Sequence, residues 1–326
     1  MTPGVAIVGC GLIGQKRAHA LRGGKVVACA DVVLERAEGL ASATGAIAAR
    51  DWREVIARDD VTMVIVATTN DLLAEITTAA LAADKHVLVE KPAARSVREI
   101  DEVIAAQKTS GCLVHVGFNH RYHPAMRKAR ELVDAGEAGE MMFVRGRYGH
   151  GGRVGYDREW RADPKLAGGG ELIDQGVHLI DLARQFVGDV RDVRGYTTTY
   201  FWDMPVDDNA FMLLTSARGQ SAFLHVSCTE WKNLFSFEIY GRTAKLHAEG
   251  LGGSYGVERL TLYKMRPEMG PPDTTAWEYP RPDESWALEL EEFMDDIARQ
   301  RQPSAGLADA RAALAVVEAI YEERME

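Results

Sequence analysis

Residues 5–14 read VAIVGCGLIG, and this stretch decides the fold of the first part of the chain. An apolar run predicts a strand, and three glycines follow it with the spacing GxGxxG. In a strand–turn–helix unit, the first glycine permits a tight turn, the second lets the backbone approach a pyrophosphate, and the third lets the helix pack on the strand. Phosphate oxygens then meet the N–H groups at the positive end of the helix. The sequence therefore predicts dinucleotide contacts from Gly9, Gly11, Leu12, Ile13 and Gly14.

Asp31 ends the second predicted strand, seventeen residues after Gly14. A carboxylate at this point accepts hydrogen bonds from a ribose 2′-OH and repels a 2′-phosphate. Val32 and Val33 follow it, and the nearest arginine, Arg36, lies a turn later, so no cation stands ready for a phosphate. The pattern favours NAD over NADP.

The first 120 residues alternate continuous apolar runs with amphipathic helical segments. This alternation is typical of a parallel sheet covered by helices on both faces. We expect a doubly wound Rossmann α/β domain over residues 1–122. The predicted strands are 5–9, 26–31, 63–68, 86–90 and 113–118, and the predicted helices are 12–21, 34–44, 52–58, 71–83 and 96–110.

The pattern changes after residue 124, where strands follow one another without intervening helices. Period-two alternation in such a run predicts a mostly antiparallel open sheet. The segment 266–284 holds five of the eleven prolines and predicts an irregular crossing. We expect an α+β domain for substrate binding and oligomerisation over 123–326, with C-terminal helices able to pack back on the first domain. The predicted strands are 141–148, 193–201, 209–215, 221–227, 235–241, 245–249 and 259–264, and the predicted helices are 124–135, 171–186, 285–300 and 307–324.

Composition excludes several classes of protein. The chain has 326 residues with 46% apolar and 26% charged side chains, which is ordinary for a globular protein of two domains. A net charge of −10 argues against nucleic-acid and anionic-membrane partners. No run of apolar residues is long enough for a membrane span, and the N-terminus does not read as an export signal, so we expect a cytoplasmic protein. The cysteines are far apart and the cluster Cys112, His115, His120 and His123 fits no usual zinc spacing, so no metal is expected.

Two further motifs carry candidate catalytic groups. Residues 90–92 read EKP at the end of a predicted strand, where a doubly wound sheet binds ligands, and Pro92 fixes the exit of the chain beside Lys91. Residues 168–178 read GGGELIDQGVH, in which the glycines leave room for the backbone to approach a ligand. Asp174 and His178 are four residues apart, so they share one face of a helix and suit an acid–base pair.

Taken together, these motifs resemble the glucose–fructose oxidoreductase/inositol dehydrogenase/rhizopine catabolism (Gfo/Idh/MocA) family over nearly the whole chain. The similarity includes AALAADKHVLVEKP at 79–92, GFNHRYHP at 117–124 and the segment 160–182. The resemblance implies an NAD-dependent oxidoreductase with Lys91, Asp174 and His178 as catalytic residues. It also implies cofactor contacts from Thr68, Thr69, Asn70, Glu90 and Lys91, and substrate contacts from Asn119, Arg121, Asp174 and His178. The run at 68–73 lacks the proline and histidine that the family commonly has there, and Asp84 replaces a usual glycine.

The resemblance implies oxidation of a ring hydroxyl of a sugar, with either Lys91 or His178 as the base and a slight preference for His178. The loop 149–165 adds a basic and aromatic cluster that suits phosphate oxygens and rings. It favours a sugar phosphate or a nucleotide sugar. Among these, the resemblance implies the C3 hydroxyl of a nucleotide-linked or amino sugar as the leading choice. The loop also fits a solvated or subunit-bridging segment. The substrate contacts predicted in or beside this loop are Tyr148, Arg153, Tyr156, Trp160 and Arg161.

Other functions on the same fold stay open at this point. They are an inositol dehydrogenase, a glycosidase that uses NAD transiently, and a non-catalytic sugar sensor that binds NAD(P). The joint presence of Lys91, Asp174 and His178 favours an enzyme over a sensor. The exposed sheet face expected in the second domain favours a homodimer or homotetramer.

Overall fold

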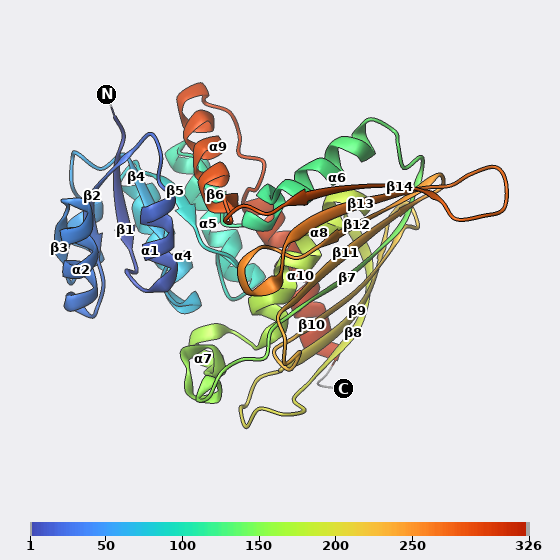
Figure 1. Cartoon of the computed structure of the whole chain (residues 1–326). Helices are drawn as coiled ribbons and strands as arrows, with labels where there is room; N and C mark the ends of the chain where they lie inside the picture. The colour runs from blue at the N-terminus through green and yellow to red at the C-terminus, as the bar shows by residue number, and fades with distance from the viewer. Residues whose placement is uncertain (1, 324–326) are drawn as a thin grey trace. The chain divides into compact units, whose positions relative to one another are not determined.

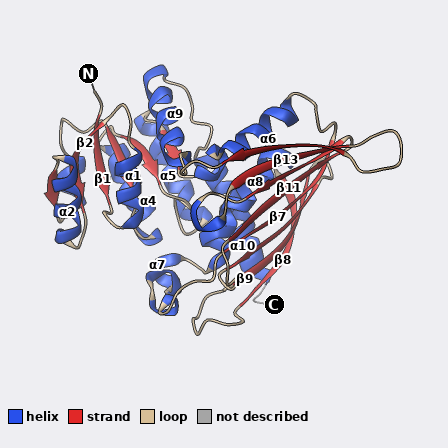
Figure 2. Ribbon diagram, viewed as in Figure 1, coloured by secondary structure: helices blue, strands red, loops and turns tan. Residues whose placement is uncertain are grey.

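The computed structural model describes residues 2–323, which form two compact units (Figure 2). The first unit holds residues 2–118 together with residues 165–168 and 286–311. The second unit holds Asn119–Pro164, Gly169–Ser285 and residues 312–323.

The first unit is built on a parallel sheet, in which residues 2–323 supply six strands in the order β3-β2-β1-β4-β5-β6 (Figure 1). This order reverses direction beside β1, as in a doubly wound fold, and the predicted Rossmann fold is confirmed. The strands are β1 Gly4–Val8, β2 Lys25–Ala30, β3 Ile47–Ala49, β4 Met63–Val66, β5 His86–Val89 and β6 Val114–Val116. The helices are α1 Leu12–Ala20, α2 Leu34–Thr44, α3 Trp52–Ile56, α4 Asn70–Ala82 and α5 Val97–Ser110, joined by α9 Ser285–Arg299.

Apolar strands and α9 share one core in the first unit. Ile7, Ile65 and Leu88 on neighbouring strands are fully buried, and Leu290 and Phe293 of α9 belong to the same cluster. Helix ends are set locally: the Ser96 side chain accepts a hydrogen bond of 3.2 Å from the N–H of Glu99 at the start of α5. The core therefore joins the N-terminal βα units to a helix from the far end of the sequence.

The second unit is built on a mostly antiparallel sheet, with the order β14-β13-β12-β11-β7-β10-β9-β8 in the described part of the chain (Figure 1). β7 and β10 run parallel, and the other neighbours are antiparallel. The strands are β7 Met141–Gly149, β8 Val190–Thr198, β9 Asn209–Ser216, β10 Ser221–Ser227, β11 Leu234–Gly241, β12 Ala244–Glu249, β13 Glu258–Lys264 and β14 Asp273–Tyr279. The main helices are α6 Pro124–Asp134, α8 Val177–Val187 and α10 Leu307–Glu323.

The two faces of this sheet differ along β7. Val144, Gly146 and Tyr148 are buried, whereas Arg145 and Arg147 are exposed. A Cβ at Gly146 would lie 3.3 Å from the Leu179 side chain, so α8 packs closely on the buried face. The alternation turns the aromatic Tyr148 toward the helices that carry the candidate site.

Three sequence predictions need correction. The segment 266–284 is not wholly irregular, because β14 pairs with β13 along seven residues. The strand was missed because prolines flank it and most of its side chains are exposed, as is typical of an edge strand. The short β3 was also missed, and the predicted helix 171–186 begins with a π-helical turn at Leu172–Gly176 before α8. The predicted last helix includes residue 324, which lies outside the described residues.

Candidate functional site

The predicted dinucleotide turn has the geometry that its glycines require. Gly9 has φ +92°, and a Cβ there would lie 2.4 Å from the carbonyl oxygen of Ala67. A Cβ at Gly14 would lie 1.9 Å from the Gly9 carbonyl oxygen, so α1 packs directly on the turn. A Cβ at Gly11 would meet no atom of residues 2–323 within 4 Å outside its neighbours. The turn is therefore open on the side where a pyrophosphate would approach the N-terminus of α1.

Asp31 lies directly beside this turn. Its Oδ2 accepts a hydrogen bond of 2.8 Å from the Cys10 N–H, and its Oδ1 accepts one of 2.8 Å from the Val33 N–H. Each oxygen keeps further lone-pair capacity for ribose hydroxyls. Leu12 and Val32 are 71% and 69% exposed, so large apolar side chains rim the turn where a nucleoside would cover them. These residues fit the predicted dinucleotide.

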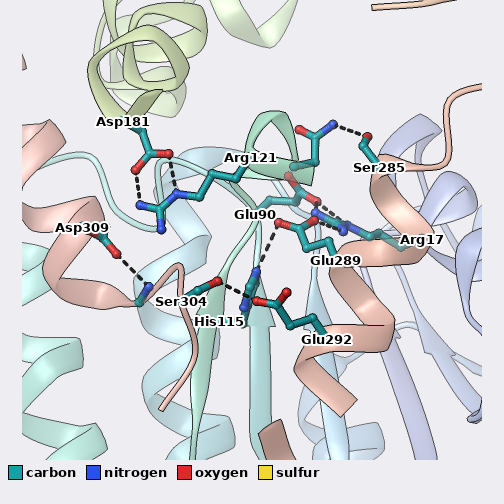
Figure 3. A network of polar contacts seen from close by, with 12 residues as sticks. Arg17, Glu90, His115, Arg121, Asp181, Ser285, Glu289, Glu292, Ser304 and Asp309 are labelled. Carbon is teal, nitrogen blue, oxygen red and sulfur yellow. Dashed lines mark hydrogen bonds and ion pairs between the residues drawn. The ribbon is translucent and has the colours of Figure 1, made fainter. Parts of the chain in front are cut away.

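Glu90, predicted as a cofactor contact, is buried in an ion-pair network (Figure 3). Arg17 of α1 bonds Glu90 through Nε at 2.7 Å and Glu289 of α9 through Nη1 at 2.5 Å. His115 Nε2 lies 3.2 Å from the other oxygen of Glu289. The Trp286 ring centroid lies 4.4 Å from the Arg17 guanidinium carbon. The network joins the helix of the dinucleotide turn to the residue that precedes Lys91.

Burial and charge oppose one another in this network. Burial raises the pKa of Glu90, and the Arg17 charge offsets only part of that effect. Burial also opposes ionisation of Glu289, but Arg17 and His115 outweigh it and lower the pKa of this carboxyl. Glu289 therefore depends on the Arg17 guanidinium and on its hydrogen bond with His115 for its charge.

The other predicted cofactor residues follow parallel strands of the first unit. Thr68 and Thr69 come after β4, and Lys91 comes after β5, at the same edge as the glycine turn. The Thr69 hydroxyl bonds Asp71 at 2.6 Å. Asn70 donates its amide at 2.9 Å to the Ala167 carbonyl, so it holds the segment 165–168. The carboxyl edge of this sheet therefore collects the predicted contacts, as expected for a doubly wound fold.

In the second unit, Asp174 and His178 lie on the π-helical turn and the first turn of α8. They are 8% and 4% exposed. Arg161 Nε donates a hydrogen bond of 2.9 Å to Asp174 Oδ2. The His178 ring centroid lies 3.9 Å from that of His120 and 6.2 Å from that of Tyr148. The structure thus brings four predicted site residues together with His120: Tyr148, Arg161, Asp174 and His178.

The glycines that precede Asp174 serve packing within the protein. The Asp207 carboxylate accepts hydrogen bonds from the N–H groups of Gly170 at 3.1 Å and Leu172 at 2.8 Å. The Tyr321 hydroxyl of α10 bonds the same carboxylate at 2.8 Å. A Cβ at Gly169 would lie 2.3 Å from the Tyr321 hydroxyl oxygen, and one at Gly170 would lie 2.1 Å from the Asp207 carbonyl oxygen. The space beside Gly169 and Gly170 is therefore filled by Tyr321 and Asp207, whereas the sequence predicted room there for the backbone to approach a ligand.

The predicted loop residues take different environments. Tyr156 is 4% exposed, and burial together with the charges of Glu171 and Asp174 raises its pKa. The Trp160 ring stacks on the Arg161 guanidinium, with 4.5 Å from the guanidinium carbon to the ring centroid. Arg153 is exposed and pairs with Glu159 at 2.7 Å.

Two other residues, predicted to contact the substrate, bond to side chains of the second unit. Asn119 donates its amide at 3.0 Å to the Ser285 hydroxyl. Arg121 forms a two-pronged ion pair with Asp181 through Nε and Nη2 (Figure 3). Both side chains thus hold the framework around the site.

Sequence reasoning missed several residues near Asp174 and His178. Glu171 is 2% exposed, and the His150 Nε2 lies 3.8 Å from its Oε1. Burial raises the pKa of Tyr255 to about 12, although its hydrogen bond with Tyr148 lowers it. His120 had a signal in the GFNHRYHP segment, and Glu171 had one in the GGGELIDQGVH segment. Tyr255 lies alone in a loop with no motif around it.

A cavity of about 540 Å³ lies in the second unit, and Phe235 and Tyr255 form part of its wall. The same two rings contact Tyr148, with centroids 5.8 Å and 5.6 Å away. The cavity is therefore adjacent to the aromatic side chains around His178. Its charged lining is mixed and comprises Arg147, Lys232, Arg259, Glu230 and Glu249.

This fold and the glycine turn define a class of dinucleotide-binding proteins, and comparisons with known proteins agree. Residues 4–118 match the oxidoreductase family with an NAD-binding Rossmann fold, and residues 126–247 match the GFO/IDH/MocA C-terminal domain. These two matches cover more than half of the chain. The chain belongs to the Gfo/Idh/MocA family of oxidoreductases, and its first domain is the NAD-binding domain of that family.

Several relatives are named for sugars or cyclitols. A levoglucosan dehydrogenase of Pseudarthrobacter phenanthrenivorans is 34% identical over 179 residues, which are 52% of this chain and 44% of the relative. The aligned stretch thus spans less than half of that protein. An inositol 2-dehydrogenase of Rubrobacter xylanophilus is 28% identical over 97% of this chain and 89% of its own length. A solved levoglucosan dehydrogenase in complex with NADH and levoglucosan is 25% identical, with a TM-score of 0.90 over 99% of this chain and 97% of that one.

Among residues 2–323, no helix is both long and apolar enough to cross a bilayer. The same residues contain no group of three or more His, Cys, Asp or Glu side chains placed to hold a metal ion.

Proposed function

We propose that this chain is an NAD-dependent dehydrogenase that oxidises a ring hydroxyl of an uncharged sugar or cyclitol. One observation carries the proposal: a buried carboxylate, Asp174, is held by Arg161 one helical turn before the buried imidazole of His178. A fixed carboxylate one helical turn from an imidazole suits removal of a proton from a hydroxyl group. The names of the relatives, levoglucosan dehydrogenase and inositol 2-dehydrogenase, support the substrate class.

Each residue has a role in the proposed reaction. His178 takes the hydroxyl proton, and Asp174 orients the substrate or the imidazole while Arg161 keeps it in place. Lys91 donates a hydrogen bond to the reacting oxygen, and its backbone is held because Arg17 binds the adjacent Glu90. NAD, held by the glycine turn and Asp31, supplies the hydride acceptor when it is bound.

The charges near the site favour an uncharged substrate over a phosphorylated one. Arg161 is paired with Asp174 and Arg153 with Glu159, so two of the cations that suggested a phosphate already have carboxylate partners. The adjacent cavity has three cations and two carboxylates in its lining, which gives little preference for an anion. A nucleotide-linked sugar, the domain boundary at 122/123, the homo-oligomer and the cytoplasmic location stay predictions.

The test mixes purified protein and NAD with levoglucosan, with inositols and, as a second arm, with nucleotide sugars and sugar phosphates. We expect the absorbance of reduced nicotinamide to rise with an uncharged ring substrate. His178→Asn should abolish the rise, and His19→Asn, which changes an exposed histidine on α1, should not. Reduction with nucleotide sugars alone would overturn the uncharged class, and equal rates in His178→Asn would overturn its role as the base.

A further inference from the structure

Three buried histidines of the second unit lie one after another, beginning at His178. The ring centroid of His120 is 3.9 Å from that of His178 and 5.6 Å from that of His123. Their exposed fractions are 4% for His178, 5% for His120 and 2% for His123. Three imidazoles thus extend from the candidate base through the interior of the unit.

The far end of this row reaches a carboxylate that contacts water. His123 Nδ1 lies 3.0 Å from Glu258 Oε2, and its Nε2 lies 3.9 Å from Asp283 Oδ1. Glu258 is buried and is fixed by a hydrogen bond of 2.6 Å from the Ala125 N–H. The Asp283 side chain is 32% exposed, and its Oδ1 accepts a hydrogen bond of 2.9 Å from the Ser285 N–H.

Aromatic rings enclose the middle of the row. The His120 ring contacts Tyr148 at 4.9 Å and Phe235 at 5.8 Å between centroids. Burial raises the pKa of the Tyr148 hydroxyl well above its usual range, so this neighbour stays protonated. At its outer end, the row pairs with the carboxylates Glu258 and Asp283.

Oxidation of a hydroxyl group releases one proton at every turnover. A buried base must lose that proton before it can act again, and an imidazole can accept a proton on one nitrogen and release one from the other. We propose that His120 and His123 conduct the proton from His178 to Asp283 and on to bulk water. This inference rests on the proposed function.

The proton balance of the relay is simple. One proton leaves the substrate oxygen for His178 while the hydride, with its electron pair, leaves the carbon for the nicotinamide. The proton then passes through His120 and His123 to Asp283, and each imidazole ends neutral. Glu258 stabilises His123 while it carries the charge. The His120 and His123 ring centroids are 5.6 Å apart, and Nδ1 of His123 is paired with Glu258. The proton therefore enters and leaves His123 through Nε2, and one water molecule bridges the gap from His120.

The test measures steady-state turnover of His120→Phe and His123→Phe with the substrate that the wild type oxidises. Phenylalanine keeps an aromatic ring for packing but carries no proton. We expect kcat to fall about tenfold or more, NAD binding to stay unchanged, and added imidazole buffer to restore part of the rate. The control is His225→Phe, which stacks on Phe211 at 4.3 Å away from the row and should keep wild-type kcat.

Asp283→Asn is the second variant, because a change at a partly exposed side chain is the least disruptive to the fold. It should lower kcat and make turnover depend on buffer concentration. Folded His120→Phe with wild-type kcat and no buffer dependence would overturn the relay while leaving the proposed function intact. Wild-type protein that reduces NAD with none of the ring substrates would instead overturn the proposed function, and the relay with it.

Discussion

Replacement of Arg17 by Met is the sharpest test of how the first unit is held together. Its side chain is fully buried between Glu90 and Glu289, whose side chains are 9% and 0% exposed. Removal of one partner from a buried ion pair leaves an uncompensated charge and costs about 3–5 kcal/mol. For a unit of this size, each kcal/mol lowers Tm by roughly 2–4 °C, so we expect Tm to fall by roughly 6–20 °C. Trp286, which stacks on Arg17, provides a local fluorescence signal for the transition.

A matched control comes from an exposed arginine with two acidic neighbours. Arg53 pairs with Asp51 and Glu75, but its side chain is 60% exposed. Exposed pairs contribute about 1 kcal/mol or less, so Arg53→Met should change Tm by only a few degrees. If Arg17→Met unfolded no earlier than Arg53→Met, the reasoning about the buried network would be refuted.

The loss of stability in Arg17→Met should be larger at neutral pH than at acidic pH. Without the guanidinium, burial raises the pKa of Glu289 as it already raises that of Glu90, and a raised carboxyl pKa destabilises the fold at high pH. That cost disappears as the pH falls through the folded pKa. In the wild type, the lowered pKa of Glu289 stabilises the fold at neutral pH, and this stabilisation is lost as the pH falls through the folded pKa. The Tm difference between the two proteins should therefore narrow from about pH 7 toward about pH 4.3, the ordinary Glu pKa.

Three further substitutions test the cofactor site, the catalytic role of Lys91 and the Tyr321 contact that holds the segment before Asp174. Asp31→Asn removes the charge that would bind the ribose hydroxyls, so the dissociation constant for NAD, measured by calorimetry, should rise roughly tenfold or more, and the preference over NADP should shrink. Lys91→Met should keep NAD affinity and lose most turnover; wild-type turnover would remove Lys91 from the reaction. Tyr321→Phe takes one hydrogen bond from Asp207 and from the segment before Asp174, so kcat should fall several-fold with unchanged NAD affinity. Unchanged kcat would mean that the Tyr321 contact does not position this segment.

The repeated βα pattern predicted most of the first unit because its strands are buried on both faces and its helices are amphipathic. Period-two alternation predicted β9 to β13 in the same way. β14 could not be predicted, because an exposed edge strand between prolines lacks a buried face. The short β3, of three residues, gives too little alternation to recognise.

Site residues could be predicted from the sequence where they lie together in one short motif. The i, i+4 spacing predicted that Asp174 and His178 share one helix face, and the glycine spacing predicted a dinucleotide turn. Partners from distant segments were not predictable: the pairing of Arg161 with Asp174 and that of Glu90 with Arg17 have no signal in the sequence. The predicted substrate contact of Arg161 and cofactor contact of Glu90 stay predictions. Local patterns specify which residues share a face, whereas tertiary packing decides which ion pairs form.

A single-turnover experiment tests the central claim most directly. Protein in excess over NAD is mixed with levoglucosan or an inositol, and reduced nicotinamide is followed by absorbance while a pH indicator follows proton release. We expect one reduced nicotinamide and one proton for each bound NAD in the wild type, and neither in His178→Asn. If no uncharged ring substrate reduced the nicotinamide, the assignment of this chain as a dehydrogenase for such substrates would be contradicted. If His178→Asn reduced the nicotinamide as well as the wild type, the assignment of His178 as the base would be contradicted.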